Sequence, residues 1–144
     1  MASELDFPAK GRVTSVKGNT VTFVPAGTNY ELYLEADGGA WVGPVNVPVE
    51  AAIRLRARKV MTVPSGGNFI SPIFGPPRIV QGKVRYLSAN VLVIHAGTNL
   101  IVELPASDSA FDLASGAIGM GSMVNATILP GGTIAMAVAK VAAG

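Results

Sequence analysis

Hydrophobic and polar residues alternate along much of this chain. Leu32 and Leu34, for example, alternate with Glu31, Tyr33 and Glu35. A period of two places successive side chains on opposite faces of a strand, one of them buried. The sequence therefore predicts an all-β protein. The predicted strands cover residues 11–17, 20–24, 30–36, 45–49, 51–63, 82–87, 91–95, 100–104, 119–129 and 133–141, with one short helical turn at 107–113.

The same pattern occurs twice, in the same order, with small insertions. Four matched segments carry the repeat: Ala26-Gly27-Thr28-Asn29 with Ala96-Gly97-Thr98-Asn99, Gly11-Arg12-Val13 with Gly82-Lys83-Val84, 49–53 with 124–128, and 61–63 with 136–138. Ordered matches of this kind indicate an internal duplication. The predicted organisation is an N-terminal lead (1–9), a first β repeat (10–63), a linker (64–80), a second β repeat (81–141) and a C-terminal tail (142–144).

Each repeat has the length of a small OB-like or SH3-like β-barrel. We expect two such barrels joined by a Pro/Gly-rich apolar linker, or one pseudo-twofold barrel. The second repeat resembles in architecture the TOBE-type modules that follow ABC ATPases and bind molybdate. The resemblance is carried by Gly82-x-Val84, the helical turn and Gly121-x-x-Val124-x-Ala126. The Thr and Ser ligand loop of that family is not matched, and shared architecture does not carry function.

The repeated tetrapeptide is predicted to lie at a hairpin corner. Glycine supplies a positive φ there, and Thr or Asn closes the turn with a side-chain hydrogen bond. The alternative is a pair of ligand-binding loops. Turn chemistry alone accounts for the four residues, so the geometric interpretation is favoured.

The amino-acid composition indicates a surface with few charges. Hydrophobic residues make up 49% of the 144 residues and charged residues only 14%, against roughly 25% charged in an average soluble domain. A surface with so few charges is expected to be covered by a second copy or by another protein. Within the linker, the apolar residues Phe69, Ile70, Ile73 and Phe74 are the candidate interface. Packing within the chain and packing between chains are equally expected for them.

One segment concentrates positive charge. Arg54, Arg56 and Arg58 alternate with apolar residues, and Lys59 breaks the alternation. These four residues and Trp41, the only tryptophan, are candidates for binding an anion or a partner. The favoured interpretation is an exposed strand face whose arginines pair with Glu31, Glu35 or Glu50 on neighbouring strands. For Trp41, a lid over the end of a small barrel is favoured over stacking on a ligand.

No constellation of catalytic residues stands out. The chain has no cysteine and one histidine, His95, which gives poor support to a metal site or a Ser-His-Asp triad. Asp108 and Asp112 are too isolated to act as an acid pair. The sequence therefore predicts no enzyme, no catalytic or metal site and no cofactor.

The terminal and apolar segments favour a cytoplasmic protein without a membrane span. Residues 1–6 are acidic and lack the pattern of a secretion signal. Pro130, Gly131 and Gly132 interrupt the most apolar region before it reaches the roughly 18 residues of a span. The expected function is a non-catalytic structural or protein-interaction module that self-assembles. The alternative is an OB-like module that binds nucleic acid or a small anion on the strand of Arg54, Arg56 and Arg58.

Overall fold

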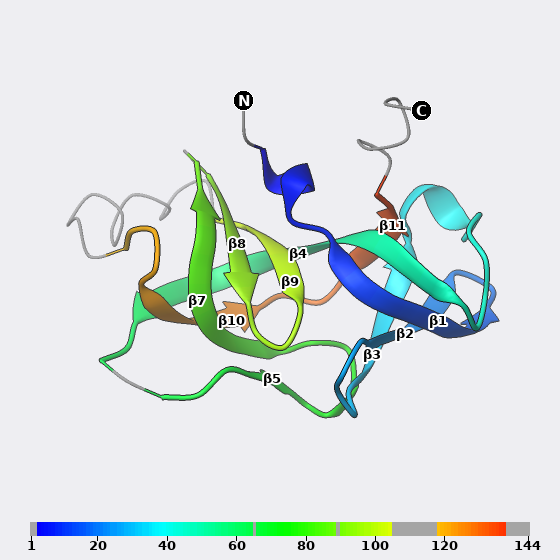
Figure 1. Cartoon of the computed structure of the whole chain (residues 1–144), viewed down its shortest axis with the longest axis horizontal. Coiled ribbons are helices and arrows are strands. Elements are labelled where there is room, and N and C mark those ends of the chain that lie inside the picture. The colour runs from blue at the N-terminus through cyan, green and yellow to red at the C-terminus, as the bar shows by residue number, and fades with distance from the viewer. Residues whose placement is uncertain (1–2, 65, 89, 105–117, 138–144) are drawn as a thin grey trace.

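The computed structural model describes residues 3–64, 66–88, 90–104 and 118–137, and this part of the chain is all-β (Figure 1). Two 3-10 turns accompany the strands, η1 (Glu4–Asp6) and η2 (Asp37–Gly39). The strands are β1 (Ala9–Lys17), β2 (Thr20–Pro25), β3 (Glu31–Ala36), β4 (Pro48–Thr62), β5 (Phe69–Ser71), β6 (Phe74–Gly75), β7 (Ile79–Leu87), β8 (Val91–His95), β9 (Asn99–Glu103), β10 (Met123–Ile128) and β11 (Thr133–Met136).

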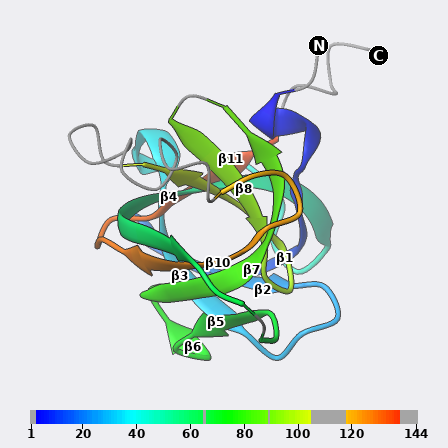
Figure 2. The same cartoon turned by 90° about the vertical axis from the view of Figure 1, so that its left-hand side faces the viewer.

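All eleven described strands belong to one mixed sheet. Hydrogen-bonded neighbours run β1–β2–β3–β11–β4 and return to β1, which closes one circuit. A second circuit runs β4–β10–β7–β8–β9 and returns to β4. In Figure 2 the ribbons of β4, β7, β8 and β10 form a ring that is seen end-on. Strand β4 takes part in both circuits, so residues from both predicted repeats share one sheet.

Strand β4 shows why the charged segment folds as a strand. Leu55 and Ala57 are buried, whereas Arg56 and Arg58 are exposed. The alternation changes at a bulge, because Ala57 pairs with Ile128 and Lys59 pairs with Thr127, which leaves Arg58 without a partner in β10. A bulge inserts one extra residue and shifts the faces beyond it. The break predicted at Lys59 is this bulge.

The main core lies on the inner faces of both circuits. Its largest fully buried side chains include Phe23, Leu32, Leu34, Ile53, Leu55, Leu92, Ile94, Leu100 and Ile134. A smaller buried cluster, separate from the main core, consists of Ala52, Val93 and Ile101. Leu5, Phe7 and Tyr86 pack against it. The ring centroids of Phe7 and Tyr86 are 5.9 Å apart. The described part of the predicted N-terminal lead therefore packs on the sheet.

Several predicted element boundaries differ from the structure. Strand β4 begins at Pro48 and continues through the strand predicted at 51–63, so only residues 48 and 49 of the strand predicted at 45–49 belong to it. The strand predicted from 119 begins at Met123. Residues 64–80, predicted as a linker, contain β5 and β6, which pair with β7 and β3. The helical turn at 107–113, the end of the last predicted strand at 138–141 and the tail at 142–144 lie outside the described residues.

Candidate functional site

The two copies of the repeated tetrapeptide form turns with left-handed glycines. Gly27 has a φ of 76° and Gly97 a φ of 87°, in the region where glycine is favoured. In the first turn, Thr28 Oγ1 donates to the carbonyl of Pro25 at 2.9 Å and accepts the N–H of Tyr30 at 3.3 Å. The predicted turn, with its positive φ and its side-chain hydrogen bond, is present in the structure.

The two turns differ in their surroundings. In the second turn Ala96 and Thr98 are buried, and Asn99 Nδ2 donates to the carbonyl of Pro8 at 3.2 Å. In the first turn Ala26, Gly27 and Asn29 are exposed. A Cβ placed on Gly97 would lie 3.4 Å from the Tyr30 ring, so the second turn packs against the first. The second turn is a structural contact, and the first is presented at the surface.

Two hollows flank the first turn. The first hollow, of about 580 Å³, is lined by Lys10, Gly11, Arg12, Val24, Pro25, Ala26, Gly27, Thr28, Pro48, Val49 and Glu50. The second hollow, of about 610 Å³, is lined by Gly27, Thr28, Asn29, Tyr30, Phe69, Ile70, Ser71 and Ile73. Gly27 and Thr28 line both, so the turn forms a ridge between them. Volumes of this size are typical of small-molecule sites.

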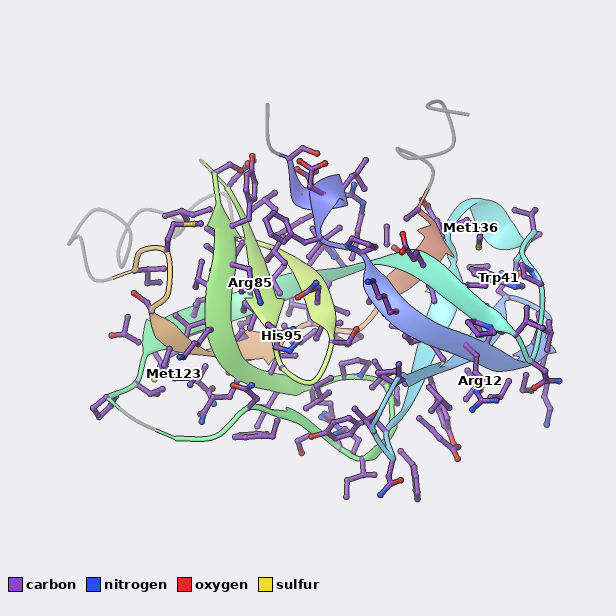
Figure 3. All side chains as sticks on the ribbon, viewed as in Figure 1. Arg12, Trp41, Arg85, His95, Met123 and Met136 are labelled. Atoms are coloured by element: carbon purple, nitrogen blue, oxygen red, sulfur yellow. The ribbon has the colours of Figure 1, made fainter. Side chains whose placement is uncertain are left out.

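Strand register fixes the arrangement of the first hollow. Lys10 of β1 is opposite Glu50 of β4. Two residues further along β1, Arg12 is opposite Val24 of β2 on one side and Pro48 of β4 on the other. Figure 3 shows Arg12 on β1, in the right-hand half of the molecule. Lys10 and Arg12 are exposed, so the first hollow combines two cations and one carboxylate with apolar neighbours.

The arginine strand has different partners from those expected. Arg54 Nη1 lies 3.6 Å from a carboxylate oxygen of Glu4 and 3.9 Å from one of Glu103. Arg56 Nη2 donates to the carbonyl of Pro130 at 3.3 Å. The expected partners Glu31, Glu35 and Glu50 form no ion pair with these arginines in the part of the chain that the structure describes. The alternation on one face agrees with the prediction, whereas the pairing does not.

Trp41 lies apart from the arginines of β4. Its indole N–H donates to the carbonyl of Pro44 at 3.1 Å, and its side chain packs against the main core. Trp41 and Met136 lie at the same end of the molecule (Figure 3), and both approach Gly43. Met136 pairs with Ala51, so Trp41 lies near the first half of β4. The predicted site residues Arg54 to Lys59 follow further along that strand.

The candidate interface residues separate into two groups. Ile70 is 2% exposed and belongs to the main core, and its N–H donates to the Tyr30 hydroxyl at 3.2 Å. Phe69, Ile73 and Phe74 remain exposed, the last two by 56% and 59%. Tyr33 and Pro76 continue this apolar region around a further hollow of about 330 Å³. We call Tyr33, Phe69, Ile73, Phe74 and Pro76 the β5–β6 surface.

Lys10, Arg12 and Glu50 were not predicted as site residues. Lys10 and Arg12 flank Gly11 and precede buried Val13, so they share the alternation that drew attention to the arginines of β4. What the sequence lacks is the register that places Glu50 and Pro48 opposite them. Strand pairing over this distance is not encoded by the local pattern.

The described residues contain no cluster of metal ligands and no membrane-spanning helix. No group of three or more His, Cys, Asp or Glu side chains there could hold a metal ion. His95 Nδ1 lies 2.9 Å from Asn99 Oδ1, within the second turn. None of the described helices has both the length and the apolar character to cross a bilayer.

Comparison with known proteins gives no match. No protein-family model, no curated protein and no solved structure matches this chain. The grounds for a function are therefore the geometry and chemistry of the described residues.

Proposed function

We propose that this protein is a non-catalytic interaction module that self-associates through the β5–β6 surface. The observation that carries the proposal is the exposure of Phe69, Ile73 and Phe74 within one short segment. Single exposed apolar residues are ordinary, but contiguous ones mark interaction surfaces.

Pairing and shared hollows support the contiguity of the β5–β6 surface. Phe69 and Ile73 line the same hollow. Phe74 pairs in parallel with Glu31, and Tyr33 lies two residues further along the same strand. Tyr33 and Pro76 line the hollow that follows. In Figure 2, β5 and β6 lie next to each other at the lower edge of the molecule.

Charge at the margins favours a second copy as the partner. Glu31 lies beside Phe74, and the N–H of Arg78 donates to the carbonyl of Ser71 at 2.8 Å. The β5–β6 surface therefore has acidic neighbours in Glu31 and in Glu35, which lines the same hollow as Tyr33 and Pro76, and a basic neighbour in Arg78. A twofold contact uses the same patch on both subunits, so Glu31 of each copy can approach Arg78 of the other. Such a surface is self-complementary in charge as well as in apolar character.

The solution mass, measured by light scattering at micromolar concentration and at low and high salt, tests the proposal. The wild-type protein is expected to be an oligomer that persists in high salt, since apolar burial dominates the contact. Phe74→Asp should yield a monomer. Val42→Asp is the matched control, because Val42 is 86% exposed outside the β5–β6 surface, and it should leave the mass unchanged. A monomeric wild-type protein, or an oligomer insensitive to Phe74→Asp, would overturn the proposal.

We infer further that the sheet arose by internal duplication and comprises two small barrels interleaved through β4. Two matching pairings and one matching bulge support this. Ala9 pairs with Ala51 as Val80 pairs with Ala126. The bulge of β1 between Val13 and Ser15 has its counterpart in β7 between Val84 and Tyr86. Lys10 is opposite Glu50 as Gln81 is opposite Asn125.

An OB-like module for nucleic acid or a small anion on the arginine strand stays a prediction. The geometry of the arginine strand supports this alternative less than the β5–β6 surface supports self-association, because Glu4 and Glu103 offset the charge of Arg54. Arg56, Arg58 and Lys59 remain exposed. Retention on an anionic column that falls steeply with salt would favour this alternative.

A further inference from the structure

We propose that the first hollow binds a small organic monocarboxylate, with Arg12 as the principal anion-binding residue. This site is separate from the β5–β6 surface, and it is not needed for self-association. Three observations support it: the charges of three side chains, the apolar residues around them and the contrast with the second half of the sheet.

The positive charge of the first hollow exceeds its negative charge by one. Lys10 and Arg12 carry one positive charge each, and Glu50 carries one negative charge opposite Lys10. A single carboxylate therefore neutralises the hollow. The planar guanidinium of Arg12 matches the two oxygens of a carboxylate. A phosphate monoester carries nearly two negative charges and would leave one of them uncompensated beside Glu50.

The remainder of the lining is suited to an apolar body. Val24 and Pro48 lie on either side of Arg12 in the register of the three strands. Pro25, Ala26 and Val49 complete the apolar part of the lining. Ligand sites combine predominantly apolar walls with a few orienting polar groups. The fitting ligand is therefore a carboxylate with a short aliphatic or aromatic tail.

The corresponding positions of the second half are occupied by internal contacts. At the register of Lys10 and Glu50 stand Gln81 and Asn125, and Asn125 Nδ2 donates to Gln81 Oε1 at 3.0 Å. Gln81 Nε2 donates to the carbonyl of Gly67 at 2.9 Å. Strand β5 also pairs with β7 at Gln81. The amides there bind each other and the β5 segment, whereas Lys10 and Arg12 face an open hollow.

Titration with sodium octanoate tests the proposal, with 1-octanol as the neutral probe and octyl phosphate as the dianionic probe. Amide chemical shifts should change at residues 10–12, 24, 26–28 and 49–50 with octanoate, and much less with 1-octanol. Calorimetry should show that Arg12→Gln weakens octanoate binding at least tenfold. Lys83→Gln is the matched control, because Lys83 holds in β7 the position of Arg12 in β1, and it should leave binding unchanged.

Two further variants test the role of the Glu50 charge and the independence of the site from self-association. Glu50→Gln should improve binding of octyl phosphate more than binding of octanoate, by at least threefold in the ratio of the two affinities. Phe74→Asp should leave octanoate binding unchanged, so failure of the site and failure of self-association are distinguishable. Absence of shifts up to millimolar octanoate, equal binding of octanol, or full affinity in a folded Arg12→Gln variant would overturn the assignment.

Discussion

At the scale of single residues, two glycines are required by close approach rather than by a turn. A Cβ placed on Gly11 would lie 2.3 Å from the carbonyl oxygen of Val24, and one placed on Gly82 would lie 2.0 Å from that of His95. Both obstacles are backbone atoms of the adjacent strand, which cannot rotate away. Each glycine therefore permits β1 or β7 to approach its neighbour closely.

Gly82→Ala should lower the free energy of unfolding by at least about 2 kcal/mol, because the added methyl group forces the two strands apart. Gly67→Ala is the control, since a Cβ there meets no atom within 4 Å. Its effect should stay within roughly 0.5 kcal/mol. Urea denaturation of both variants measures the difference, and equal stability of Gly82→Ala and wild type would contradict the close approach.

In the repeated tetrapeptide, residue type predicts the conformation of the turn but not its burial. Its turn and the positive φ of Gly27 and Gly97 follow from residue type, because few residues other than glycine adopt that conformation readily. The burial of one copy and the exposure of the other do not follow, since the four residues are identical. That difference arises from Tyr30 and Pro8, which contact the second turn and lie far from it in sequence.

At the scale of elements, Tyr30 connects the start of β3 to β5. Its hydroxyl accepts the N–H of Ile70 at 3.2 Å. Ile70 is buried, and a buried N–H that loses its acceptor carries a desolvation penalty. A single phenol therefore helps to hold residues 69–71 in place.

Tyr30→Phe should lower the free energy of unfolding by about 1–2 kcal/mol, because it removes this acceptor and leaves the ring in place. Tyr33→Phe is the matched control, since Tyr33 is exposed in β3, the strand that follows Tyr30. Thermal denaturation should show the loss in the first variant only. Amide hydrogen exchange at Ile70 should also accelerate, and unchanged exchange there would contradict the role of the hydroxyl.

Strands bounded by turn residues were predictable from the sequence, and strands that depend on distant partners were not. β2, β8 and β9 lie within one residue of the predicted ranges, because turn residues such as Gly18-Asn19 and Gly97-Thr98 mark where these short apolar runs begin or end. β5 and β6 could not be foreseen, since strands of three and two residues depend on partners in β7 and β3. The candidate anion site was missed for the same reason: Glu50 joins Lys10 only through strand register.

At the scale of the whole molecule, β4 makes the two circuits interdependent. Its residues 51–54 pair with β11, and residues 57 and 59–62 pair with β10. Most of these contacts join residues far apart in sequence, so neither circuit can be complete without strands from both parts of the chain. Local patterns carry no information on such pairings, which explains why two separate barrels remained an open alternative from sequence alone.

Unfolding should therefore be a single cooperative transition. Trp41, which packs against the main core beside η2, reports on the first circuit through its fluorescence. Far-ultraviolet circular dichroism reports on both circuits. The two signals should give the same midpoint in urea, at a protein concentration that is held constant. Separate midpoints would contradict the interdependence of the circuits.

The position of β11 in the chain has a consequence for synthesis on the ribosome. It is the last of the described strands to be made, yet it fills the place between β3 and β4. Until it emerges, the nascent chain presents the unpaired edges of both strands. Such edges are templates for pairing with a neighbouring chain. The interval before β11 is released is therefore the period in which this protein is most exposed to aggregation.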